Sequence, residues 1–144
     1  MKTTFKLVAF LLTITLLSCN ANLNLNDGVE GSGNVITEKR TINESFDKIS
    51  ASTGVTVIVE QGSPNDVEVE TDDNLMQYVI TKVENGTLIV KIDGNINTMS
   101  SIDVRVRMSS IVGLESTSGS RITSKNTLKG STIAVKSSSG SEID

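Results

Sequence analysis

The side chains with the chemistry for acid/base or charge-neutralising catalysis are two carboxylates and two arginines. Asp72 and Asp73 are the only adjacent acidic residues in the chain. Glycoside hydrolysis needs two carboxyl groups roughly 5 to 9.5 Å apart across a cleft, whereas adjacent residues in a strand or turn usually point apart. A turn or a helix N-cap therefore explains this pair better than catalysis does. Arg105 and Arg107 alternate on one face of an expected strand, where solvated edge charges explain them better than a lyase site does.

Composition excludes several reaction classes. The chain has no histidine and a single cysteine, which excludes Ser-His-Asp and Cys-His catalysis and argues against a typical zinc site. Gly31 and Gly33 lack the rest of a nucleotide-binding fingerprint. We therefore expect no catalytic residues, no metal and no cofactor.

The N-terminus predicts export and lipidation. Lys2 and Lys6 precede an apolar run, 7–17, which is shorter than the about 20 residues that span a bilayer and has the arrangement of a signal peptide. Leu16-Leu17-Ser18-Cys19 resembles the lipobox of bacterial lipoproteins, which implies cleavage after a signal peptide of residues 1–18 and acylation of Cys19. A lone cysteine in an exported protein has no internal disulfide partner, so lipidation accounts for it better than redox chemistry does.

Residues 19–30 are interpreted as the lipidated cysteine and a tether. The segment alternates asparagine with leucine and then becomes polar. The several acyl chains of a lipoprotein cysteine anchor stably in a membrane. Asn20 is not aspartate, which by the usual sorting rule of Gram-negative lipoproteins favours the outer membrane. We therefore expect an exported, membrane-anchored lipoprotein at the outer membrane or cell surface.

The rest of the chain suits one domain that binds no nucleic acid. Residues 20–144 carry 11 basic and 17 acidic residues, a net charge of −6, which disfavours a nucleic-acid surface. Phe46 and Tyr78 are their only aromatic residues, so a stacking platform for bases or sugars is almost absent. Nearly all the core must come from Val, Ile and Leu, which suits narrow stacked strands.

The last third of the chain contains a repeat with a constant offset of 21 residues. In residues 112–122 and again in 133–143, apolar residues alternate with polar ones and lead into a Ser/Thr/Gly cluster. Each copy predicts a strand, a tight turn and a second strand. The turns are Ser118-Gly119-Ser120 and Ser139-Gly140-Ser141. One such unit cannot bury its apolar face alone, so the copies must stack, as in a solenoid or β-helix.

Charges that did not define the repeat support this stacking. If one copy lies directly beside the other, Glu115 meets Lys136 and Arg121 meets Glu142, and both pairs are opposite in charge. Exposed pairs of this kind contribute about 0.2 to 1 kcal/mol each, so they specify the register more than they stabilise it.

The corner of the repeat has its own expected geometry. Gly119 and Gly140 are expected in a left-handed conformation, while the neighbouring serines are expected to tolerate replacement. Stacking also places two apolar pairs side by side and pointing inward, namely Leu114 with Val135 and Ile122 with Ile143.

Strand patterns continue upstream of the repeat, so the predicted class is all-β. Eight segments alternate or carry β-branched residues, and they are 34–42, 49–51, 55–60, 67–71, 78–84, 87–92, 102–108 and 111–116. Asn85-Gly86 predicts a two-residue hairpin, which implies a less regular, partly antiparallel region before the repeats. Only 72–76 suggests a short helical turn, with Asp72 or Asp73 as its N-cap.

An earlier segment echoes the repeat. Residues 49–57 align with residues 114–122 at an offset of 65, which is close to three repeats. We interpret this as the same architecture beginning near Phe46 and being interrupted by an irregular middle. Because no polar cap follows the last turn, the β-helix domain, 31–144, is expected to be C-terminally incomplete.

These motifs together resemble the head GIN domain family of autotransporter-type adhesins. The residues that carry the resemblance are Gly31-Ser32-Gly33-Asn34-Val35, Phe46 with Ile49, 55–62, 67–75, 85–90 and the Ser-Gly-Ser repeats. The resemblance implies a right-handed single-stranded parallel β-helix (solenoid), like that of pectin lyases, on lipoproteins of Bacteroides-like bacteria. It implies adhesion and no established activity.

The expected function is therefore a cell-envelope lipoprotein that binds a glycan or a protein through one face of a β-helix, without catalysis. A ladder of Ser and Thr hydroxyls along 116–120 and 137–141 is a candidate face, although turn chemistry also explains these residues. The alternative is a carbohydrate-active enzyme of pectin lyase-like architecture.

Overall fold

The structure, a computed structural model, describes residues 28–144, so the expected signal peptide and Cys19 lie outside it. Within this range the chain folds into strands and one 3-10 helix, Met76–Tyr78, and the all-β prediction is confirmed. The strands are β1 Val29–Glu30, β2 Val35–Lys39, β3 Lys48–Ser52, β4 Thr56–Gln61, β5 Asp66–Asp72, β6 Val79–Glu84, β7 Thr87–Ile92, β8 Ile96–Thr98, β9 Ile102–Met108, β10 Gly113–Ser116, β11 Arg121–Ser124, β12 Ala134–Ser137 and β13 Glu142–Ile143.

Two large sheets share one core. The five-stranded sheet has the order β12-β10-β3-β7-β6, and the six-stranded sheet has the order β13-β11-β4-β9-β5-β2. Along β3, β4, β5, β7 and β9 buried and more exposed residues alternate, as expected when one face is covered. The covered faces of both sheets contribute to a single cluster rich in valine, isoleucine and leucine. Phe46 is the one aromatic member of this buried cluster among the described residues, and the other members are aliphatic residues and methionines, as the composition predicted.

The two copies of the 21-residue repeat stack in parallel register. β10 pairs with β12 and β11 pairs with β13, so Leu114 lies beside Val135 and Ile122 beside Ile143. This is the pairing that the repeat predicted. Leu114 and Ile122 are buried, whereas Val135 is 60% exposed because β12 is an edge strand with one neighbour.

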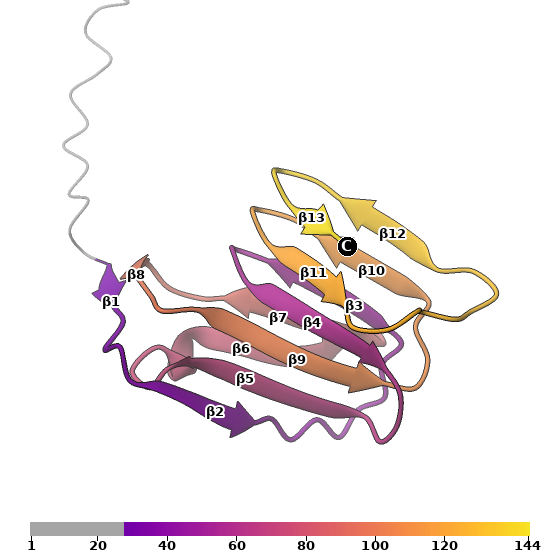
Figure 1. The fold of residues 1–144 in the computed structure, drawn as a ribbon, viewed down its shortest axis with the longest axis horizontal. Helices are drawn as coiled ribbons and strands as arrows, with labels where there is room; N and C mark the ends of the chain where they lie inside the picture. Colours follow the sequence, from indigo (N-terminus) through magenta and orange to yellow (C-terminus); the bar gives the residue numbers. More distant parts are fainter. Residues whose placement is uncertain (1–27) are drawn as a thin grey trace, which may run out of the picture.

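The segment that echoes the repeat forms the layer next to the two copies. β3 pairs with β10 and β4 pairs with β11, both in parallel and both at the offset of 65. β7 and β9 then pair with the opposite edges of β3 and β4, so the middle of the chain lies on the far side of this layer (Figure 1). The interpretation that the repeat architecture begins near Phe46 is therefore confirmed, and the middle of the chain interrupts it in sequence. The middle does not separate the layers in space, so the closeness of 65 to three repeats has no structural meaning.

The expected antiparallel region is present at the end of both sheets that lies away from the repeats. β6 pairs antiparallel with β7 across the turn at Asn85 and Gly86, whose φ values are 49° and 73°, as a two-residue hairpin with a right-handed twist requires. In the other sheet β5 pairs antiparallel with both β9 and β2. Parallel layers carry the repeats, and antiparallel strands complete the opposite end.

The predicted helical turn at 72–76 is misplaced. The 3-10 helix begins at Met76 after Leu75, and it has no side-chain cap. The side chains of Asp72 and Asp73 are engaged instead by residues 32–34 and Ser100. The last two residues of the expected tether, 29–30, form β1, which pairs with β8 outside the two large sheets.

Candidate functional site

The corners of the repeat form a column of three similar turns. Ser118 and Gly119 have φ values of 54° and 72°, and Ser139 and Gly140 have φ values of 55° and 72°. The left-handed conformation expected for the two glycines is thus found, and the serine before each glycine shares it. Backbone bonds join neighbouring turns, because Gly119 donates to the Ser139 carbonyl at 3.1 Å. A further bond of 3.1 Å joins Gly54 to the Ser118 carbonyl.

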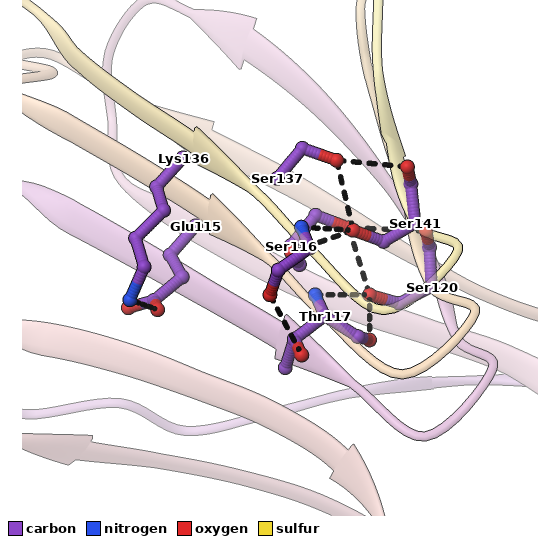
Figure 2. Close-up of polar contacts among 8 residues, drawn as sticks. Glu115, Ser116, Thr117, Ser120, Lys136, Ser137 and Ser141 are labelled. Atoms are coloured by element: carbon purple, nitrogen blue, oxygen red, sulfur yellow. Dashed lines mark hydrogen bonds and ion pairs between the residues drawn. The ribbon is translucent and has the colours of Figure 1, made fainter.

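The serines that flank these turns point into the stack. Ser116 and Ser120 are 0% and 1% exposed. The Ser120 hydroxyl lies 2.9 Å from the Ala51 carbonyl and 2.7 Å from the Thr117 carbonyl, and it accepts the Thr117 N–H at 3.1 Å. In the next layer Ser141 repeats this geometry and lies 2.6 Å from the Ser116 carbonyl (Figure 2).

This inward orientation corrects two expectations. Ser116 and Ser120 cannot present an outward ladder of hydroxyls to a ligand, because their hydroxyls are buried and bonded to backbone. Ser120 is also not a position that should tolerate replacement, since its side chain is buried and its hydroxyl bonds to the Ala51 and Thr117 carbonyls and to the Thr117 N–H, contacts that a larger apolar side chain would remove from a site without free space. Hydrogen bonds at the corner therefore join neighbouring layers of the stack.

The ion pairs that the repeat predicted are both present. Lys136 Nζ lies 2.6 Å from Glu115 Oε1 (Figure 2), and Arg121 Nη2 lies 2.5 Å from Glu142 Oε2. All four side chains are more than a third exposed. The pairs therefore specify the register while adding little stability.

A charged hollow lies on the outer face of the six-stranded sheet, and we call it the charged groove. Its volume is about 360 Å³. Two cross-strand rows line it: Glu60, Arg107 and Asp66 in one, and Ile58, Arg105 and Glu68 in the other. Lys125, just after β11, completes the lining. The acidic strand β5 and the basic strand β9 thus place alternating charges side by side.

The arginines of the charged groove are oriented by carboxylates. Arg105 donates two bonds to Glu70, at 3.0 and 3.1 Å, and this contact lowers the pKa of the Glu70 carboxyl and raises the pKa of the Arg105 guanidinium. Arg107 lies 3.1 Å from Glu60. β9 is a central strand, so the interpretation of the two arginines as edge charges is wrong. Beside them, burial and the nearby Glu70 raise the pKa of Asp103.

Two charged residues of the charged groove have no counter-ion among the ion pairs of residues 28–144. These are Lys125 and Glu68, whereas Asp66 pairs with Lys39 at 2.8 Å. The groove therefore offers a cation on its β11 side and an anion on its β5 side. Donors and acceptors are both available to a polar ligand.

Asp72 and Asp73 do not converge on a cleft. Asp72 accepts bonds from Gly33 and Ser100, while Asp73 accepts bonds from Ser32 and Asn34. Both carboxylates thus hold backbone segments together. In the described part of the chain, no group of three or more His, Cys, Asp or Glu side chains is placed to hold a metal ion.

Cys19, the predicted lipidation site, lies outside the described residues. Residues 28–144 contain no helix with the length and hydropathy to cross a membrane. The charged groove was not predicted, although its signal was present in two strands, Asp-Val-Glu-Val-Glu at 66–70 and Val-Arg-Val-Arg at 104–107. The pairing of those strands could not be known from the sequence.

The stacked parallel layers and the antiparallel strands at the opposite end define an all-β fold, and the sequence matches a known family. Residues 45–144 match the family described as "Putative auto-transporter adhesin, head GIN domain". The chain therefore belongs to the head GIN domain family. No curated protein has significant sequence similarity to it.

Several solved structures share the fold. One described as a putative adhesin from Parabacteroides merdae is 24% identical, with a TM-score of 0.69 over 77% of this chain and 47% of that one. Another, described as a putative adhesin from Bacteroides fragilis, is 19% identical, with a TM-score of 0.73 over 81% and 55%.

A third similar structure, described as a putative lipid binding protein from Parabacteroides distasonis, is 20% identical, with a TM-score of 0.58 over 67% of this chain and 43% of that one. The present chain thus spans about half the length of these structures. At such identities the likeness establishes the fold.

Proposed function

We propose that this protein is a lipid-anchored adhesion module of the cell envelope that binds its ligand through the charged groove. Family membership supports adhesion, and the lipobox-like residues ending at Cys19 support the anchor. The parallel ladders of β3, β10 and β12 and of β4, β11 and β13 support a right-handed single-stranded parallel β-helix in this part of the chain.

The charged groove carries the proposal because it combines a hollow with charged groups that the fold does not use. Lys125 and Glu68 have no counter-ion among the described ion pairs, and Arg107 is 45% exposed. At the repeat corner, by contrast, the hydroxyls of Ser120 and Ser141 are bonded to backbone carbonyls of the stack. A ligand in the groove would therefore find a donor at Lys125, just after β11, and an acceptor at Glu68 on β5, on either side of the central strand β9.

The charge balance of the groove favours an uncharged, hydroxyl-rich glycan. Three acidic and three basic side chains line the groove, so a ligand with strong net charge meets as much repulsion as attraction. Sugar hydroxyls both donate and accept hydrogen bonds and can satisfy both signs. Without an aromatic platform a single site should bind weakly, and many anchored copies would supply avidity.

Binding to an array of uncharged glycans, acidic glycans and extracellular-matrix proteins tests this proposal. We expect the mature protein to bind uncharged glycans, and Arg107→Ala with Lys125→Ala to reduce that binding at least tenfold. Lys91→Ala, on the outer face of the other sheet, is the matched control and should bind normally. Equal binding by the groove variant and the control would overturn the assignment, and binding to matrix proteins alone would replace the glycan with a protein ligand.

A further inference from the structure

The N-terminal segment of the described chain is attached to the stack in an unusual way. Residues 28–34, which we call the strap, contain β1 and contact β8 through the backbone bonds Val29 N to Asn95 O and Gly31 N to Thr98 O, both 2.8 Å. β1 and β8 form a separate two-stranded sheet at the side of the stack where the chain leads to residues 1–27 (Figure 1). None of the strap's residues belongs to the buried core.

The buried carboxylate of Asp72 is the first of three side chains that hold the strap. Asp72 is 0% exposed. It accepts the Gly33 N–H at 2.8 Å, the Ser100 N–H at 2.9 Å and the Ser100 hydroxyl at 3.0 Å. The strap passes so close that a Cβ on Gly31 would lie 2.5 Å from Asp72 Oδ2. Asp72 therefore joins the strap to the loop that precedes β9.

The next two residues complete this attachment, and we call Asp72, Asp73 and Asn74 the clasp. Asp73 accepts the Ser32 hydroxyl at 2.5 Å and the Asn34 amide at 3.0 Å. Asn74 accepts the Ser32 N–H at 3.0 Å and donates to the Glu30 carbonyl at 2.7 Å. Three consecutive side chains thus form hydrogen bonds to four of the five strap residues 30–34, and the fifth, Gly31, packs against Asp72.

The strap and the stack are held by different forces. Hydrogen bonds to carboxylates are strong but short-ranged, and each is lost once its atoms separate by an ångström or two. The stack is held by a continuous apolar core, which unfolds cooperatively. A segment with polar attachments and no core residues opens at lower free energy than the sheets it is attached to.

We infer that the strap is a detachable extension of the tether, and that the clasp releases it before the stack unfolds when the chain is pulled from its N-terminal side. The source of the pull, an anchor at Cys19, rests on the proposed function, whereas the separate opening of the strap does not. Seven residues at roughly 3.3 to 3.6 Å each give up to about 25 Å of additional reach. An adhesion module held this way could yield to load while its sheets and charged groove stay folded.

Hydrogen exchange of the mature protein tests the separate opening. The amides of Ser32 and Gly33 should exchange at least tenfold faster than that of Arg121, which is bonded to Val55 within the stack. Asp73→Asn and Asn74→Ala should speed exchange in the strap at least threefold and leave Arg121 unchanged. Glu44→Gln, an exposed loop substitution, is the control. Equal exchange in strap and stack, or equal acceleration of both by the clasp variants, would overturn the inference.

Single-molecule pulling tests the added reach. With one handle at residue 20 and one at residue 91, an early step of about 25 Å or less should precede unfolding of the sheets, and Asp73→Asn should lower its force. Unfolding in one event, with no earlier step, would contradict the inference. If the early step occurs but the protein binds no glycan, the separate opening of the strap is established and the proposed function is rejected.

Discussion

Leu114 lies directly beside Ile49, which precedes it by 65 residues in the chain. The strand that carries Ile49, β3, also pairs with β7 on its other edge. β3 is therefore central, and both of its neighbours come later in the sequence. The layer formed by β3 and β4 therefore lies between the repeats on one side and the strands β7 and β9 on the other.

The position of a residue within the stack should decide what its loss costs. Ile122 and Ile143 occupy equivalent places in the repeat, but Ile122 is fully buried between two layers whereas Ile143 is at the edge. Ile122→Ala should lower the free energy of unfolding by about 2 to 5 kcal/mol, and Ile143→Ala by clearly less. Chemical denaturation measures both, and equal losses would contradict the arrangement of the layers.

The corner glycine should be required for its backbone conformation alone. A Cβ on Gly119 would meet no atom within 4 Å, but its φ of 72° strains a β-branched residue. Gly119→Val should cost about 1 to 3 kcal/mol. Gly119→Asn should cost less, because asparagine adopts this conformation more readily. Denaturant midpoints that are the same for the two variants would rule out backbone strain as the cause.

Much of the fold could be predicted, because alternation and turn residues are local signals. The eight expected strands correspond to β2–β7, β9 and β10, and the 21-residue offset predicted the parallel register of the last layers. The order of the layers could not be predicted, because an offset of 65 does not say which strands lie between. The charged groove depends on that order, since it exists only where β4, β9 and β5 are neighbours.

Acid should weaken the fold partly through Asp72. Bonds from the Ser100 N–H, and then from the Ser100 hydroxyl and Gly33, hold the pKa of Asp72 below its usual value despite burial. A carboxyl whose pKa is lower in the folded state stabilises it above the unfolded pKa of about 3.9, and this contribution is lost as the pH falls through the folded value. Asp73 beside it, with its pKa lowered chiefly by Ser32, acts in the same direction.

Denaturation of the wild type and of Asp72→Asn at pH 7 and pH 3 measures this contribution. The free energy of unfolding should fall with pH in the wild type, and it should fall less steeply in Asp72→Asn, which has no proton to bind at this position. Glu44→Gln is the charge-matched control. If the two proteins had the same pH dependence, the Asp72 carboxylate would not be a source of acid sensitivity.

The anchor has its own test. Acylation at Cys19 should incorporate a labelled fatty acid and place the protein in the membrane fraction, because several acyl chains anchor stably. Cys19→Ala should lose both the label and the membrane association, with Ser18→Ala as a control that keeps the cysteine. Membrane partition that is unchanged in Cys19→Ala would refute the lipoprotein assignment.

The most direct test of the proposed function measures how strongly cells that display the full-length protein adhere to surfaces coated with uncharged glycans. Cells that display the wild type are compared with cells that display a groove variant at the same level. Arg107→Glu with Lys125→Glu should reduce adhesion at least tenfold, whereas Lys82→Glu with Lys91→Glu, the same charge change on the other sheet, should leave it within about twofold. Long-range charge does not hold an uncharged ligand, so wild-type adhesion should change little between 50 and 300 mM salt. Over this range the Debye length falls to below about 10 Å, and adhesion that depended on long-range charge would weaken. Adhesion that survives the groove variant, or that falls equally in both double variants, would contradict the assignment of function to the charged groove.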